Sequence, residues 1–304
     1  MFSGHFRVLP LTCMVRCLPG IARILRRLLL SAAATMVPLT AGFVANAASL
    51  PAPHTVEIPY SNGILHAQLY RPDGDGPFPT VIALHGCGGL SGRSEPVQER
   101  YRDWAEQLVK SGQAVLLPDS YGSRELGPQC RVKERTVHGR RERVEDVAAS
   151  RRWLLQQAWV ARDRISLIGW AGGANALLWA VRPQSLTRDI APDFRSAVAF
   201  YPDCRVSAGL GWSARVPTLI LIGAKDDVAS PPACRQMIDG ARGRSALTRF
   251  VVYPGAYHDF DRANLPFHAV SGTSDAGAPD HGHIGGDAEA RADSEKLVTE
   301  WLAR

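Results

Sequence analysis

The sequence predicts an α/β fold with a mostly parallel, doubly wound sheet, and two patterns carry that prediction. Apolar runs of four or five residues recur along the chain, separated by longer segments with helical periodicity. Continuous apolar runs of this length are typical of parallel strands that are buried on both faces. Their alternation with helices indicates βαβ crossovers, which place a ligand site outside the carboxyl ends of the strands.

An N-terminal β-hairpin is expected to open the domain, because segments 56–60 and 64–70 flank the turn signal Ser-Asn-Gly at 61–63. Further strands are expected at 80–84, 114–117, 165–168, 197–200, 218–222 and 249–252, and helices at 97–111, 140–157, 173–181, 232–241 and 288–303. In the second helix the residues Val144, Val147 and Leu154 share one face. We therefore expect that helix to pack one side on the sheet.

Two long connections, 120–139 and 264–287, are rich in glycine and charged residues. Long irregular loops in a compact domain are usually functional or disordered. Each follows a strand end or a candidate catalytic residue, so we expect them to wall the mouth of the site; mobile surface loops are the alternative. No repeat or linker divides the chain, which predicts a single domain over 55–304 after a short join at 48–54.

Residues 1–47 are expected to be a cleaved export signal. Arginines extend to Arg27, an apolar run covers 28–44, and Ala-Asn-Ala at 45–47 predicts cleavage before Ala48. The pair at 26–27 followed by three leucines resembles a twin-arginine signal, but an ordinary secretory signal is slightly favoured. A retained membrane anchor is the other alternative, although the apolar run is short for a spanning helix and contains Pro38. We expect a periplasmic or secreted protein without stable membrane association.

The formal net charge is +6, yet residues 1–47 hold five arginines and no acidic residue. Nearly all of the excess positive charge therefore lies in the expected export signal. A protein that binds nucleic acid needs a basic footprint on its folded part, so we expect no nucleic-acid partner. With 45% hydrophobic and 21% charged residues the chain can bury a large core. We expect a small-molecule ligand and, by default, a monomer.

Four cysteines remain after the leader is removed, namely Cys87, Cys130, Cys204 and Cys234. An even number in an oxidising compartment favours disulfides, and four cysteines allow three connectivities. We expect the pairs Cys87–Cys130 and Cys204–Cys234, because each would join segments at the same edge of the sheet; free buried thiols are the alternative. Metal binding is disfavoured by the absence of a C-x-x-C spacing.

The segment Gly-Trp-Ala-Gly-Gly at 169–173, between an expected strand and an expected helix, matches a nucleophile elbow. In G-x-S-x-G the glycines relieve crowding where a strained turn lifts the central side chain to the edge of the sheet. The central residue here is Ala171. A methyl group has no lone pair with which to attack a carbonyl, so this position cannot form an acyl-enzyme.

A second glycine-rich turn, His-Gly-Cys-Gly-Gly at 85–89, directly follows the strand expected at 80–84. Such a turn can present a backbone N–H to a developing oxyanion. We expect the donors to be the N–H groups of Cys87 and of Gly172, the residue after the elbow position. A phosphate-binding loop is the competing interpretation, but no Gly-Lys-Ser/Thr follows.

Two more strand ends carry side chains suited to acid–base chemistry. Asp226 follows the strand expected at 218–222, and His258 follows the one at 249–252. A histidine can act as general base while an aspartate fixes its tautomer, and the chain order elbow, Asp, His is that of hydrolases with this elbow. We prefer Asp226 to Asp227, which should point away. His281 and His283 suggest a metal only weakly, because no further clustered ligand is visible, and we expect none.

Six segments together carry a resemblance to a known family: Leu-His-Gly-Cys-Gly-Gly at 84–89, Leu-Pro-Asp-Ser at 117–120, Gly-Trp-Ala-Gly-Gly at 169–173, Phe-Tyr-Pro-Asp-Cys at 200–204, Gly-Ala-Lys-Asp-Asp at 223–227 and Tyr-Pro-Gly-Ala-Tyr-His at 253–258. From about residue 55 to 304 the chain resembles the dienelactone hydrolase family of the α/β-hydrolase superfamily. The resemblance implies hydrolysis of esters or lactones without a cofactor. It also implies that Asp226 and His258 are triad partners and that Cys87 and Gly172 supply the oxyanion donors. Ala171 departs from the family, which has Ser or Cys there.

The alanine leaves three interpretations open. In the first, a serine was deliberately replaced by alanine; the presence of the expected export signal argues against this, because it is normally removed from engineered chains. In the second, the chain is a natural pseudoenzyme that binds a ligand without cleaving it. In the third, His258 activates water or abstracts a substrate proton in non-covalent chemistry. Substitute nucleophiles, Cys87, Ser120 or Ser123, are disfavoured. Basic residues of the connection at 120–139 would attract an anionic substrate: Arg124, Arg131, Lys133 and Arg135.

Overall fold

The computed structural model describes residues 52–61, 63–271 and 281–304. They belong to one compact unit, Ala48–Arg304. The expected export signal and its cleavage site lie outside the described residues, as does Asn62 of the hairpin turn. Within the described ranges no helix combines the length and the apolar character needed to span a membrane.

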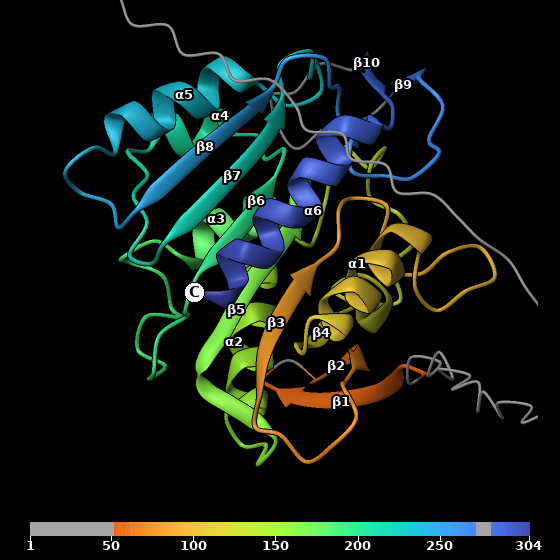
Figure 1. Ribbon diagram of the computed structural model, residues 1–304, viewed down its shortest axis with the longest axis vertical. Helices are drawn as coiled ribbons and strands as arrows, with labels where there is room; N and C mark the ends of the chain where they lie inside the picture. Colours follow the sequence, from red (N-terminus) through yellow and green to blue (C-terminus); the bar gives the residue numbers. More distant parts are fainter. Residues whose placement is uncertain (1–51, 62, 272–280) are drawn as a thin grey trace, which may run out of the picture. The chain divides into compact units, whose positions relative to one another are not determined.

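A doubly wound, mostly parallel sheet forms the centre of the fold, as predicted (Figure 1). Its eight strands follow the order β1-β2-β4-β3-β5-β6-β7-β8. The hairpin strands β1 and β2 are antiparallel, β2 is antiparallel to β4, and all other pairs are parallel. The strands are β1 His54–Tyr60, β2 Gly63–Tyr70, β3 Phe78–Leu84, β4 Ala114–Pro118, β5 Val160–Trp170, β6 Ala197–Phe200, β7 Thr218–Gly223 and β8 Thr248–Tyr253.

Helices cover both faces of this sheet, with α1 and α6 in front and α2 and α3 behind in the view of Figure 1. Strands β4, β6 and β7 are buried along their whole length, which explains why their sequences are continuous apolar runs. The helices are α1 Glu99–Lys110, α2 Glu142–Leu154, α3 Gly172–Ala180, α4 Arg205–Gly209, α5 Pro231–Gly240 and α6 Ala288–Ala303.

The prediction for α2 was only partly right. The apolar residues Val144, Val147 and Leu154 are buried as expected, but Arg143 and Arg151 are buried too. Both arginines find hydrogen-bond acceptors inside the protein, Arg143 at a backbone carbonyl and Arg151 at the Thr187 carbonyl and the Asp193 carboxylate. A charged residue that is buried with a partner cannot be distinguished in a sequence from one that faces solvent. The apolar residues of α2 therefore indicate only part of the surface that this helix buries.

The connection at 264–287 contains regular structure that the sequence did not predict. Strands β9 (His268–Ser271) and β10 (His281–Ile284) pair in a separate antiparallel sheet. Ile284 also bridges to His258, and the N–H of Gly285 donates to the His258 carbonyl at 3.1 Å. This hairpin is therefore attached to the loop that carries His258. The short helix α4 and the 3₁₀ turn Gly122–Arg124 were also not predicted.

Candidate active site

The elbow adopts the strained turn that its glycines predict. Ala171 lies between β5 and α3 with φ 48° and ψ −116°, a region that costs a residue with a side chain roughly 1–3 kcal/mol. Its N–H donates to the Phe200 carbonyl at 3.0 Å, and its carbonyl accepts from Asn175 in the first turn of α3. A Cβ at Gly173 would overlap the Leu84 carbonyl, so α3 can approach β3 closely only with glycine there.

The oxyanion loop, residues 85–89, is held by hydrogen bonds at three successive residues. The His85 carbonyl accepts from Arg143 Nη2 at 2.7 Å, the Gly86 N–H donates to the Tyr101 hydroxyl at 2.8 Å, and the Cys87 carbonyl accepts from the Gln129 N–H at 2.7 Å. Three different segments thus fix the peptide that carries the Cys87 N–H. Such fixed backbone donors cost no reorganisation during a reaction.

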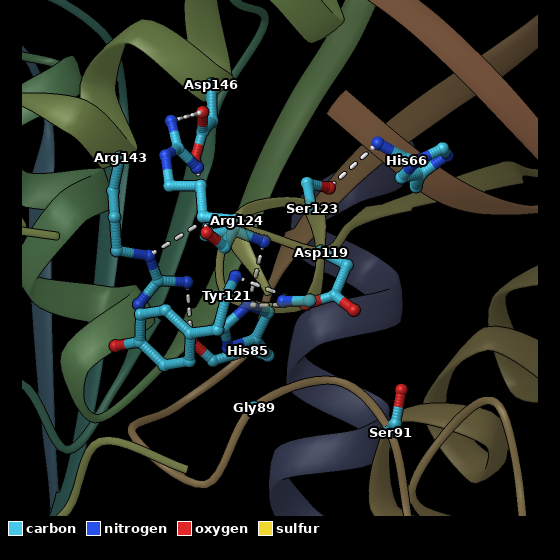
Figure 2. A network of polar contacts seen from close by, with 12 residues as sticks. His66, His85, Gly89, Ser91, Asp119, Tyr121, Ser123, Arg124, Arg143 and Asp146 are labelled. Atoms are coloured by element: carbon cyan, nitrogen blue, oxygen red, sulfur yellow. Dashed lines mark hydrogen bonds and ion pairs between the residues drawn. The ribbon is translucent and has the colours of Figure 1, made fainter. Parts of the chain in front are cut away.

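A polar network lies behind this loop (Figure 2). Arg124 forms an ion pair with the buried Asp146 at 2.7 Å and also donates to the Ser120 carbonyl. The Ser120 N–H in turn donates to His85 Nε2 at 3.2 Å. Burial and the neighbouring charge of Arg143 lower the pKa of His85 well below 6.5, so this histidine is neutral and structural.

Both predicted disulfides are confirmed. Cys204–Cys234 joins two side chains that are fully buried, whereas Cys87–Cys130 ties the oxyanion loop to the connection at 120–139. Cys87 and Cys130 also line the main cavity of the site. One disulfide therefore fixes the core and the other fixes a wall of the cavity.

The structure places Asp226 and His258 in a direct hydrogen bond. Nδ1 of His258 lies 2.8 Å from Oδ2 of Asp226, and both side chains are almost fully buried. Oδ1 of the same carboxylate accepts from the N–H groups of Val228 at 3.0 Å and Ala229 at 2.7 Å. Burial alone would lower the pKa of His258, but the Asp226 charge and hydrogen bond outweigh it, and the pKa lies above its usual 6.5.

A cavity of about 300 Å³ brings together four of the five sequence-predicted site residues. Ala171, Gly172, Cys87 and His258 all line it, while Asp226 supports His258 by the hydrogen bond already described. Both long connections contribute to the walls as predicted, one with Cys130 and Arg131 and the other, through β9 and β10, with Val270, Ser271 and Ile284. The expected nucleophile position, the expected base and the expected oxyanion donors therefore line one cavity.

A charged cluster beside His258 was missed by the sequence analysis. Asp259 lies between Arg100, at 2.7 Å, and Arg262, at 3.4 Å. Burial opposes ionisation, but the charges of Arg100, His258 and Arg262 lower the pKa of Asp259 to about 2. Both arginines line the cavity. For Arg262, the sequence signal was its position four residues after His258. For Arg100 there was no signal, because a charged residue in a helix usually lies on the solvent-exposed face.

Tyr201 was also missed, and it connects this cluster to His258. Its ring lies 4.4 Å from the His258 ring, its hydroxyl accepts from Arg100 at 2.9 Å, and it donates to Asp261 at 2.5 Å. Asp261 also accepts from the indoles of Trp104 and Trp170. The wall behind His258 is therefore a buried hydrogen-bonded network, in which only Nε of Arg100 lacks a partner among the described residues, and it favours one fixed orientation of the imidazole.

His283, the candidate metal ligand of the sequence, is paired with Asp227 at 2.7 Å. Across the described ranges no cluster of three or more His, Cys, Asp or Glu side chains could hold a metal ion. Asp227 thus pairs with His283, whereas Asp226 pairs with His258.

Comparison with known proteins agrees with this architecture. Curated relatives include a putative carboxymethylenebutenolidase from Methylorubrum extorquens, 23% identical over 239 residues that cover 72% of this chain and 76% of that protein. A cocaine esterase from Rhodococcus is 25% identical over 215 residues, covering 66% of this chain, but the match spans only 35% of the esterase.

Solved structures with the same fold include a putative dienelactone hydrolase from Klebsiella pneumoniae, with a TM-score of 0.62 and 20% identity over 83% of this chain and 98% of that chain. A dienelactone hydrolase-like promiscuous phosphotriesterase from metagenomic libraries gives a TM-score of 0.65 at 17% identity, over 84% of this chain and 98% of that one. The model of the dienelactone hydrolase family matches residues 65–304. The chain belongs to the dienelactone hydrolase family.

Proposed function

We propose that this chain is a hydrolase of the dienelactone hydrolase type, with a cavity that takes carboxylic esters or lactones and needs no cofactor. The observation that carries the proposal is the Asp226–His258 hydrogen bond beside a cavity that Ala171 also lines. Family membership supports the reaction class. The esterase and carboxymethylenebutenolidase named among the relatives support the substrate class.

The geometry fits a nucleophile–His–Asp mechanism in which residue 171 supplies the nucleophile. A hydroxyl at that position would give its proton to His258 while its oxygen attacked the carbonyl carbon. The N–H groups of Cys87 and Gly172 would stabilise the oxyanion, and Asp226 would stabilise the imidazolium. Ala171 removes the attacking atom and leaves the other parts in place, so this covalent route is closed in the unmodified chain.

Ala171→Ser tests the proposal directly. The variant and the unmodified chain are assayed side by side with p-nitrophenyl acetate and with an enol lactone. We expect kcat to rise by up to about 10⁶-fold, the size of the loss in kcat when the nucleophile is removed from a serine hydrolase triad. Ala171→Ser combined with His258→Gln is the matched control and should lose the gain. A serine variant that is folded yet no more active than its parent contradicts the proposal.

A ligand-binding pseudoenzyme on the same fold is the second candidate, and Ala171 itself favours it. Such a protein would bind an ester in the cavity without cleaving it. Titration calorimetry with the unmodified chain, followed by chromatography of the ligand recovered, separates the two. Binding with complete recovery of intact ester supports the pseudoenzyme; release of the acid contradicts it.

We propose that the substrates include anionic esters. Arg131 lines the cavity, as do Arg100 and Arg262, although the last two already pair with Asp259. Arg124, one of the basic residues expected to attract such a substrate, is instead paired with Asp146. Arg131 is thus the guanidinium of that connection best placed to meet an anion. Arg131→Gln should raise KM for a carboxylate-bearing ester more than for its neutral methyl ester, measured in the Ala171→Ser background.

We also propose that the mature chain acts, as a monomer, in the periplasm or outside the cell. Two disulfides support an oxidising compartment, where such bonds persist. Fractionation of cells that express the full chain, with N-terminal sequencing of the mature protein, tests the compartment and the cleavage before Ala48. Light scattering of the same material tests the monomer. An uncleaved protein in the cytoplasmic fraction would contradict the proposed compartment.

A further inference from the structure

We infer that the unmodified chain hydrolyses activated esters and enol lactones slowly, with a water molecule as nucleophile and His258 as its general base. This inference rests on the proposed function, because it uses the same cavity and the same substrate class. It differs from that function in the attacking atom, and it differs from the pseudoenzyme in predicting turnover without any change at position 171.

The base is in place regardless of residue 171. Nδ1 of His258 is engaged by Asp226, whose second oxygen is held by two backbone N–H groups. This fixes the tautomer in which Nδ1 carries the proton and Nε2 is the basic nitrogen. The neighbouring Tyr201 ring and its buried hydrogen bonds hold the imidazole from the side.

The oxyanion donors are equally independent of that side chain, because they are backbone groups. Cys87 is fixed through its disulfide to Cys130 and through the hydrogen bond from Gln129. Gly172 is the first residue of α3, whose N-terminal N–H groups carry partial positive charge. Electrostatic stabilisation of this type is usually the largest single contribution to hydrolysis of an acyl group.

The cavity can seat the water that the inference needs. The elbow still raises the Cβ of Ala171 into a cavity of about 300 Å³, much larger than the roughly 30 Å³ that one water occupies in the liquid. A methyl group is one oxygen atom smaller than the side chain of serine. A water beside it can donate to Nε2 of His258 and remain in line with a carbonyl that the N–H groups of Cys87 and Gly172 polarise.

The reaction balances without another reactant. The water oxygen forms a bond to the carbonyl carbon while one water proton moves to His258 Nε2, and the carbonyl π electrons move to its oxygen. When the tetrahedral intermediate collapses, the bond to the leaving oxygen breaks with its electron pair. The proton on Nε2 then passes to that oxygen or to solvent, giving acid and alcohol or enol. Leaving groups that depart as stable anions suit this route best, since water is a weaker nucleophile than a bound alkoxide.

The test uses the unmodified full-length chain with p-nitrophenyl acetate and an enol lactone. Every sample that retains Ala171 is first treated with phenylmethylsulfonyl fluoride, which inactivates contaminating serine hydrolases but finds no serine at position 171; the Ala171→Ser variant is assayed without the inhibitor. We expect multiple turnovers without a burst, at up to about 10³-fold above the uncatalysed rate, the range left when triad members are removed from hydrolases. We also expect the rate to rise with pH as His258 loses its proton.

His258→Gln should bring the rate to the uncatalysed background, and Asp226→Asn, which keeps the shape of the side chain, should lower it strongly. His283→Gln is the matched control, because it breaks an Asp–His pair that does not line the cavity, and it should keep the full rate. Near-ultraviolet circular dichroism shows whether each variant is folded.

Several results would overturn the inference: a rate at background, a rate that phenylmethylsulfonyl fluoride abolishes, or a rate that His258→Gln leaves intact. An active Ala171→Ser variant beside an inert parent would reject the water route and keep the proposed function. Inactivity of both proteins would reject the proposed function as well.

Discussion

Two neighbouring aspartates each pair with a histidine, and the two pairs differ mainly in their exposure to water. Asp226–His258 and Asp227–His283 have similar lengths, 2.8 and 2.7 Å. The side chains of the first pair are 0% and 8% exposed, whereas those of the second are 45% and 43% exposed. The bond length alone therefore does not distinguish a candidate catalytic pair from a surface pair.

Burial changes what the same contact can do. Inside the protein the Asp226 charge is poorly screened and raises the pKa of His258 in spite of desolvation. At the surface, solvent screens the second pair, and His283 also stacks on the exposed ring of Phe267. The comparison teaches that the cavity, rather than the pair, makes His258 a candidate base.

The largest expected difference is in catalysis. In the Ala171→Ser background, Asp226→Asn should lower kcat by on the order of 10⁴-fold, because the imidazole loses the partner that fixes its tautomer. Asp227→Asn should change kcat less than twofold. Steady-state kinetics with p-nitrophenyl acetate measures both. Equal losses in the two variants would show that the second pair also supports the reaction.

A smaller difference is expected in titration. The raised pKa of His258 predicts that activity of the serine variant rises with pH to a midpoint above 6.5, as the base loses its proton. Asp226→Asn removes the main influence that raises this pKa and leaves desolvation, so the midpoint should move to lower pH. NMR titration of His258 in both proteins measures the shift. An unchanged midpoint would contradict the assignment of Asp226 as the cause.

The pairs should also stabilise the fold over opposite ranges of pH. The folded-state pKa of His258 is raised, so its contribution is complete below the unfolded pKa of about 6.5 and is lost as pH rises through the folded value. Calorimetric unfolding of wild type and His258→Gln from pH 5 to 9 should show the difference shrinking as pH rises. A difference that grows over that range would reverse the sign and contradict the prediction.

The smallest effect is expected at the exposed pair. Burial alone would raise the pKa of Asp227, but the hydrogen bonds and the charge of His283 together outweigh it and lower that pKa. The contribution of this pair is therefore present above about pH 4 and is lost as pH falls through the folded value. Because the pair is exposed, Asp227→Asn should cost at most about 0.5 kcal/mol at pH 6. Denaturant unfolding at pH 6 and pH 2.5 measures it, and a large loss at the lower pH would contradict the assignment.

Local signals made much of this molecule predictable from its sequence. The elbow needs glycine at fixed positions, and the strands buried on both faces need continuous apolar runs. Both features can therefore be recognised from a few consecutive residues. Chain order then placed Asp226 and His258 at the same sheet edge, and the cysteines at that edge formed the expected pairs.

The features that escaped prediction depend on partners far away in the chain. Arg143 is buried because a carbonyl 58 residues away accepts its hydrogen bond, and Arg100 because Asp259 and Tyr201 surround it. A helix pattern assigns such charges to solvent. Strands β9 and β10 are as short as β6, but they lack the continuous apolar run by which β6 was recognised.

Under the proposed export, the Cys87–Cys130 bond would form only after the chain has left the reducing cytoplasm. The bond closes a span of 43 residues and joins Cys87 to the connection at 120–139 beside it, at residues that both line the cavity. A newly synthesised chain in a reducing cytoplasm would hold the oxyanion loop through hydrogen bonds alone. Oxidation after such export would add a covalent link to the hydrogen bonds that already hold this loop.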